Sequence, residues 1–111
     1  MSMLGKPNVY ADISMMDILA EPAALASALR TWFGAWPEKV MFGTDAFDGG
    51  DPQGWEQVAW VASHNARVAL TAALTWMMRD GEITRERAKE IARMVLRDNA
   101  IKAYGLAKTV K

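Results

Sequence analysis

The sequence predicts an α/β fold in one segment that spans residues 1–111. One short run is rich in β-branched and aromatic residues, and a second is short, apolar and bounded by turn residues, and both are patterns of strands. The stretch between them has apolar side chains at helical spacing. Two further helical patterns fill the second half of the chain. A strand, a crossover helix and a second apolar strand form a βαβ unit, in which the two strands pair in parallel.

The composition supports one packed core and excludes several classes of protein. The 111 residues are 51% hydrophobic and 23% charged, and 13 basic side chains balance 13 acidic ones. These values exclude a disordered tail or a basic nucleic-acid-binding arm. Cysteine is absent, which excludes disulfide scaffolds and thiolate zinc sites. No apolar run approaches the roughly 20 residues of a membrane helix, and no signal peptide is visible. We therefore expect a cytoplasmic protein with no membrane partner.

Charge is distributed unevenly along the chain. Residues 1–60 carry three basic and eight acidic side chains, so residues 61–111 carry the opposite excess. The basic residues of the second half are interleaved with glutamates, which is typical of a solvated helical surface. We therefore expect no nucleic-acid partner.

The first half of the chain holds the predicted βαβ unit. The first strand is predicted over Asn8–Ser14, which follows a proline. Pro22 suits the first turn of the next helix, because its missing N–H costs nothing there, and Ala23–Phe33 continues that helix. The second strand, Lys39–Gly43, is short and apolar, which is the pattern of a strand buried on both faces.

The second half of the chain is predicted to be helical after a polar loop. Thr44–Gly54 is rich in glycine, proline and aspartate, and we expect the chemistry of the protein in this loop. A long amphipathic helix is predicted over Trp55–Arg79. Thr84 is the predicted N-cap of the last helix, which we expect to bend near Asn99. Two ion pairs are expected on its outer surface, Glu86 with Lys89 and Glu90 with Arg93.

Asp45 is the candidate site residue because it follows the second predicted strand. In parallel α/β sheets, ligands and catalytic groups gather at the carboxyl ends of the strands. If the extended geometry persists to Asp45, this residue lies on the same face as Met41 and Gly43. If Val40 and Phe42 also pack on helices, Asp45 points to the inner mouth of the sheet. Position alone leaves a second role open, in which Asp45 accepts hydrogen bonds from N–H groups of its own loop.

Other residues that could carry chemistry are better explained by packing and solvation. The only histidine, His64, lies on the polar line of the long helix with Arg67 and Thr71, so we interpret it as an exposed residue and not as a ligand or a base. The five tryptophans and eight methionines fall at packing spacings. We interpret them as core residues and as a contact surface.

Three pieces of the sequence resemble the C-terminal end of an amidohydrolase. They are Pro7–Ser14, Lys39–Asp45 with its Phe-Gly-Thr-Asp ending, and Arg97–Leu106, which contains Asn-Ala-x-x-x-x-Gly-Leu. They occur in the family's order and span most of the chain. The resemblance is to the metal-dependent hydrolase and decarboxylase branch, whose fold is a (β/α)8 barrel. It implies a partial barrel, namely the last two βα units plus a C-terminal helix, which is the C-terminal quarter to third of the whole.

The resemblance also implies a catalytic and metal-binding role for Asp45. In the family, the aspartate that ends the eighth strand helps to bind a divalent metal, Zn or Mn, and accepts a proton from the attacking water. The implied function is part of a metal-dependent hydrolase acting on a C–N, C–O or carboxylate-bearing small molecule, and Thr44 is assigned support only. This sequence lacks the family's His-x-His pair, so we expect the isolated chain to be inactive.

Two alternatives follow from the residues themselves. The first is a non-enzymatic interaction domain that docks another chain through Trp- and Met-rich faces, in which Asp45 is only a loop residue. Two strands alone leave apolar surface uncovered, so we expect a homo-oligomer or association through that surface. The second alternative is a helical bundle in which the two predicted strands are not strands.

Overall fold

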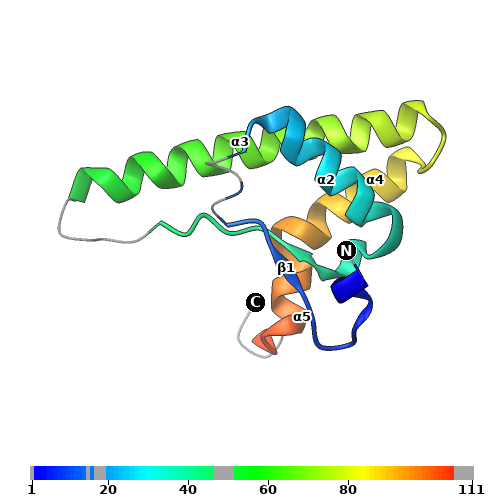
Figure 1. The fold of residues 1–111 in the computed structure, drawn as a ribbon, viewed down its shortest axis with the longest axis horizontal. Coiled ribbons are helices and arrows are strands. Elements are labelled where there is room, and N and C mark those ends of the chain that lie inside the picture. Colours follow the sequence, from blue (N-terminus) through cyan, green and yellow to red (C-terminus); the bar gives the residue numbers. More distant parts are fainter. Residues whose placement is uncertain (1, 15, 17–19, 47–51, 107–111) are drawn as a thin grey trace.

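The structure is a computed structural model that describes residues 2–14, 16, 20–46 and 52–106. Most of these residues are helical, and each of the two strands has two residues (Figure 1). The elements in chain order are η1 (Ser2–Gly5), β1 (Ala11–Asp12), α2 (Pro22–Ala35), η2 (Pro37–Lys39), β2 (Val40–Met41), α3 (Pro52–Arg79), α4 (Arg85–Arg93), η3 (Met94–Asp98) and α5 (Asn99–Ala103).

The predicted partial (β/α)8 barrel is wrong, because the structure is a small helical domain. The two strands do pair in parallel across the crossover helix α2, as the sequence predicts, with Ala11 opposite Val40 and Asp12 opposite Met41. Within the described residues, however, this sheet has only two strands. The βαβ unit is therefore present without the longer sheet that a barrel needs.

The C-terminal helical segment closes the outer edge of β2. The Met41 carbonyl faces β1, where it accepts a hydrogen bond from the Ile13 N–H, so the main chains of Val40 and Phe42 face the opposite edge. There the Phe42 N–H donates to the Val95 carbonyl at 3.0 Å. The buried Asn99 side chain donates to the Val40 carbonyl at 2.9 Å. A third strand would bind these same groups, so the helix takes the place of that strand.

A single π-helical segment makes this contact between helix and strand possible. In η3 the Asn99 N–H donates to the Met94 carbonyl, five residues back, and not to the Val95 carbonyl as in an α-helix. The Val95 carbonyl therefore accepts from Phe42 of the neighbouring segment. The sequence predicts a bend near Asn99, and the structure has this π segment, Met94–Asp98, directly before that residue.

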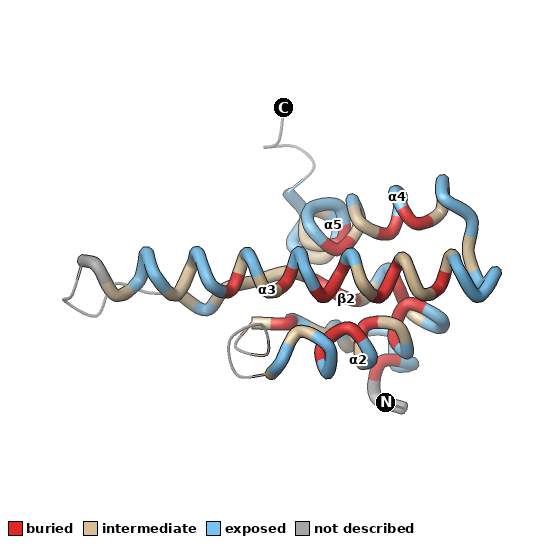
Figure 2. Tube along the Cα trace, turned by 90° about the horizontal axis from the view of Figure 1, so that it is seen from above, coloured by how far each residue is buried: buried red, intermediate tan, exposed pale blue. Residues whose placement is uncertain are grey.

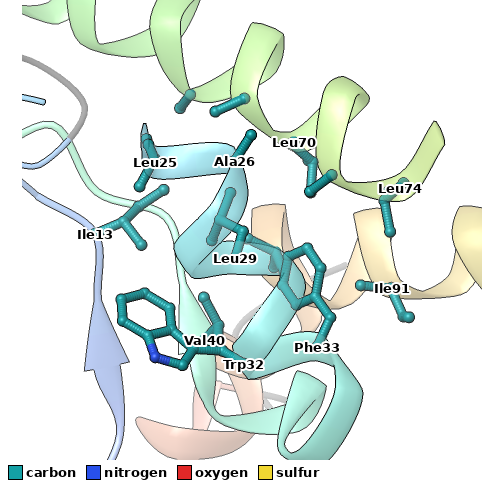
Figure 3. Close-up of a cluster of buried hydrophobic side chains, with 14 of the residues drawn as sticks. Ile13, Leu25, Ala26, Leu29, Trp32, Phe33, Val40, Leu70, Leu74 and Ile91 are labelled. Carbon is teal, nitrogen blue, oxygen red and sulfur yellow. The ribbon is translucent and has the colours of Figure 1, made fainter. Parts of the chain in front are cut away.

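The hydrophobic core lies where α2, α3 and α4 pack over the strands (Figures 2 and 3). Alanines dominate the buried stripe of α3, and their small side chains let the larger residues of α2 approach its backbone closely. Burying each large aliphatic side chain contributes about 1.5–3 kcal/mol. Buried residues include Ile13, Leu25, Ala26, Leu29, Trp32, Phe33, Val40, Ala66, Ala69, Leu70, Ala73, Leu74 and Ile91.

The helix boundaries mostly follow the predicted signals. Helix α2 begins at Pro22, and the Thr84 hydroxyl caps α4 by accepting a hydrogen bond from the Arg87 N–H at 3.1 Å. Helix α3 begins at Pro52, earlier than the predicted Trp55, because proline suits the first turn of a helix. Among the described residues, no helix combines the length and the apolar character that a membrane crossing requires.

Ion pairs on the helix surfaces agree with the prediction only in part. Lys89 and Glu86 pair at 3.8 Å as expected. Glu90 pairs with Arg87 at 2.8 Å and not with Arg93, because the position three residues before it is equally close on a helix. A larger cluster joins α2 to the turn after α3, where Arg30 of α2 contacts Asp80 and Glu82. Hydrogen bonds to Glu82 and Asp80 raise the pKa of Arg30, so this cation stays charged.

Candidate functional site

The candidate site lies at the carboxyl ends of β1 and β2. Asp12 ends β1, and Gly43 follows β2. A Cβ atom placed on Gly43 would lie 2.3 Å from Ser14 Oγ and 2.8 Å from Asp12 Oδ1, so these three residues are in contact. Parallel pairing accounts for the contact, because it places the carboxyl ends of both strands at the same edge.

One oxygen of the Asp12 carboxylate organises the chain after β1. Asp12 Oδ1 accepts hydrogen bonds from the Ser14 N–H at 2.8 Å and from the Ser14 hydroxyl at 2.5 Å. This turn is typical of aspartate, whose short side chain reaches the backbone two residues ahead. Both bonds use the same oxygen, which leaves Oδ2 as the atom of this exposed carboxylate that could meet a ligand.

Asp45 lies two residues beyond Gly43 and is exposed, but not in the predicted geometry. Its φ angle is +57°, so the chain is left-handed there and the extended geometry has ended. The expected alternation, which would place Asp45 on the same face as Met41 and Gly43, therefore does not hold. Within the described part of this turn, Thr44 Oγ1 accepts a hydrogen bond from the Ala46 N–H at 3.2 Å. The catalytic and metal-binding role of Asp45 stays a prediction.

The donors near the strand ends suit part of a metal site. Asp12, Ser14, Thr44 and Asp45 offer only oxygen atoms, which hard divalent cations such as Mn²⁺ prefer, whereas Zn²⁺ favours nitrogen and sulfur. Among the described residues, no group of three histidine, cysteine, aspartate or glutamate side chains lies close enough to hold a metal ion. A metal at this edge would therefore need further ligands from outside the described residues.

His64 is not part of this cluster. It lies on α3, exposed to solvent, and its ring stacks on that of Trp60 with centroids 5.2 Å apart and planes 2° from parallel. Its predicted exposure is therefore confirmed, and the structure adds an aromatic partner that the spacing of four residues on a helix makes possible.

A hollow in another part of the structure offers little chemistry. It has a volume of about 930 Å³ and lies between α2 and the start of α4, with Arg30 and Arg87 in its lining. Both arginines already pair with carboxylates, Arg30 with Glu82 and Arg87 with Glu90. The hollow therefore lacks the unpaired positive charge that would select an anionic ligand.

Sequence reasoning missed the contact of Asp12, Ser14 and Gly43. A signal for it exists in the sequence, because an aspartate two residues before a serine at the end of a strand is typical of a side-chain turn. A glycine after the neighbouring strand adds to that signal, since glycine is favoured where another chain approaches closely. Asn99 was expected only as the position of a bend, yet it is the buried polar residue that holds β2.

Comparison of the chain with protein-family models, curated proteins and solved structures found no match.

Proposed function

We propose that this chain supplies Asp45 to a metal-dependent, amidohydrolase-like hydrolase whose other metal ligands lie outside the described residues. The observation that carries the proposal is the parallel pairing of β1 and β2, which gathers Asp12, Ser14 and Gly43 at one edge with Asp45 two residues further on. Such an edge is where α/β sheets bind ligands. The Phe-Gly-Thr-Asp and Asn-Ala-x-x-x-x-Gly-Leu stretches that resemble the family support the same assignment.

The proposed chemistry divides between the metal and the carboxylates. A bound divalent metal, Zn or Mn, would lower the pKa of a water molecule and make it a nucleophile. Asp45 is an exposed carboxylate and would accept the proton that this water loses. Asp12, which is held by hydrogen bonds from Ser14, lies at the same edge. The substrate is a small molecule with a C–N, C–O or carboxylate bond to be broken.

Metal binding is tested by titrating Mn²⁺ into the ¹⁵N-labelled chain. Asp45→Asn is a clean variant, because asparagine tolerates a left-handed backbone as readily as aspartate does. We expect paramagnetic broadening to start at the amides of Gly43, Thr44 and Asp45 and to disappear there in Asp45→Asn. Glu38→Gln, which removes another exposed carboxylate, is the matched control and keeps the broadening. Equal broadening in Asp45→Asn would contradict the proposal.

The catalytic role needs the missing ligands. When the chain is joined to a polypeptide that supplies the histidine ligands, Asp45→Asn should lower kcat by roughly 10²–10⁴-fold, the usual contribution of a general base. The circular dichroism spectrum should stay the same. A rate that is unaffected by this substitution would end the assignment of Asp45.

The second candidate function is a non-enzymatic interaction domain, which the exposed apolar side chains of the structure favour. The described large hydrophobic residues that are exposed are Tyr10, Trp55, Trp60, Val61, Val68, Leu96, Tyr104 and Leu106. The expected methionine contribution is not among them. In this function Trp60→Ser weakens association, while Asp45→Asn leaves it unchanged, so the same two variants separate the two functions.

A further inference from the structure

Helix α3 has one half that packs on the domain and one half that extends beyond it. Figure 1 shows its first turns reaching past the other elements, and Figure 2 shows α2 and α4 beside its second half. Its buried residues begin at Ala62, and none of residues 54–61 is buried. With 28 residues the helix is about 42 Å long, and its protruding part, which ends at residue 61, has about three turns.

A stripe of apolar side chains runs along the outer surface of α3, on the side away from the core. Trp60 is 67% exposed and stacks on His64, and Val61 and Val68 are exposed as well. Successive spacings of four residues place Trp60, His64 and Val68 along one side of a helix. A shallow hollow of about 500 Å³, lined by His64, Val68 and Trp76 among others, continues the stripe into the packed half.

Two opposite charges border this stripe, one in each half of the helix. Glu56 lies in the protruding half and Arg67 in the packed half, and both are exposed. Their separation of eleven residues is close to three helical turns, so they lie on the same edge of the stripe. Within the described part of the chain, neither belongs to an ion pair. Their midpoint lies between Val61 and Ala62, where the buried half of the helix begins.

We propose that the outer surface of α3 pairs with the same surface of a second copy of this chain, antiparallel, about a two-fold axis between Val61 and Ala62. In an antiparallel pair with this symmetry, each edge of the stripe faces the same edge of the other helix. Glu56 of each copy then faces Arg67 of the other, which forms two complementary charge pairs. Trp60 and His64 of both copies meet near the axis.

The shape of the domain agrees with this arrangement. Reversing one helix about the midpoint lays the protruding half of each α3 along the packed half of the other, so both exposed halves gain a neighbour at once. A partner without this reversed order of acid and base would not match both Glu56 and Arg67. The pairing involves neither Asp45 nor a metal, and it deepens the interaction function by identifying the partner as a second copy.

Charge exchange tests the antiparallel register. Sedimentation equilibrium should show a concentration-dependent dimer for the natural chain. Glu56→Arg and Arg67→Glu should each raise the dimer Kd about tenfold or more, because each creates two like-charge contacts per dimer. The double variant should return the Kd to within about threefold of the natural value. If both single variants dimerise as well as the natural chain, or the double variant fails to recover, the register is wrong.

Two further variants test the surface without relying on charge. Trp60→Ser should raise the Kd by more than about tenfold with an unchanged circular dichroism spectrum, whereas Lys102→Glu, an exposed change on α5, should leave it unaltered. Because the natural chain contains no cysteine, Val61→Cys places a single thiol beside the proposed axis. Mild oxidation should link two Val61→Cys copies efficiently and two Lys102→Cys copies poorly. A chain that stays monomeric to about 1 mM would overturn the dimer and leave the Mn²⁺ test of Asp45 unaffected.

Discussion

Gly43 is a residue whose neighbours leave no room for a side chain. A Cβ at this position would come within 2.3 Å of Ser14 Oγ and 2.8 Å of Asp12 Oδ1. Gly43→Ala should therefore displace the Ser14 hydroxyl and break its bond to Asp12, which we expect to lower the free energy of unfolding by about 1–3 kcal/mol. Urea denaturation followed by circular dichroism measures the change.

Gly34 provides the matched control for this substitution. A Cβ on Gly34, within helix α2, meets no heavy atom within 4 Å. Gly34→Ala should raise stability by about 0.5–1 kcal/mol, because alanine has the better helix propensity. The opposite signs of the two Gly→Ala changes are the test, and equal effects would show that the strand ends are not in contact as described.

Asn99 is a buried polar residue that joins the C-terminal helix to β2. Its side-chain nitrogen donates to the carbonyls of Pro37 at 2.7 Å and Val40 at 2.9 Å. Asn99→Ala should leave both buried carbonyls without this donor and lower the free energy of unfolding by about 2–4 kcal/mol. Lys102→Ala, an exposed change on α5, should have little effect in the same chemical denaturation assay. A loss below about 0.5 kcal/mol for Asn99→Ala would mean that Asn99 does not hold β2.

At the scale of elements, α4 depends on its N-cap. The Thr84 hydroxyl accepts from the Arg87 N–H, which otherwise lacks a partner at a helix start. Thr84→Ala should lower the free energy of unfolding by about 1 kcal/mol, while Thr84→Ser, which keeps the oxygen, should retain most of the stability. Thermal denaturation of both variants measures the difference. If serine fails to restore the transition, the hydroxyl bond is not the cause.

Local patterns predicted the helices better than the strands. Pro22, Thr84 and the apolar stripe of α3 are signals carried by adjacent turns, so their helices could be predicted from sequence. The strands predicted over Asn8–Ser14 and Lys39–Gly43 have only two residues each in the structure, because a strand extends only as far as its partner strand continues. Their parallel direction was predictable, since it follows from the crossover helix between them.

The exposed half of α3 makes a prediction for the whole molecule. At low protein concentration the amides of residues 54–61 should exchange with solvent much faster than those of residues 66–77, because none of residues 54–61 is buried. Raising the concentration should slow exchange in residues 54–61 as copies associate. Hydrogen–deuterium exchange with mass spectrometry, repeated over a dilution series, measures both effects. Protection that is equal in both halves at every dilution would contradict them.

The size of the sheet could not be predicted from local patterns. A buried apolar strand looks the same whether its outer edge meets another strand or a helix. Here that edge meets Val95 and Asn99, more than fifty residues later in the chain, through a π segment with no evident sequence signal. The barrel prediction is therefore wrong because a long-range contact, which local patterns do not reveal, closes this edge with a helix.

Prediction of the candidate site from sequence was limited in the same way, in this case by one backbone angle. The position of Asp45 after a strand was predictable, but its orientation was not, because the alternation of side chains ends where φ becomes positive. The contact of Asp12, Ser14 and Gly43 depends on the register of two strands, which a single sequence specifies only weakly when each strand has two residues.

Because Asn99 closes the edge of β2, that edge can be closed only after Asn99 has been synthesised. The donor lies 59 residues after the carbonyl that it binds. At a translation rate of about 5–20 residues per second, the ribosome needs roughly 3–12 s to add that stretch. Throughout this interval the nascent chain carries an open strand edge, the type of surface that recruits chaperones or sticks to other unfinished polypeptides.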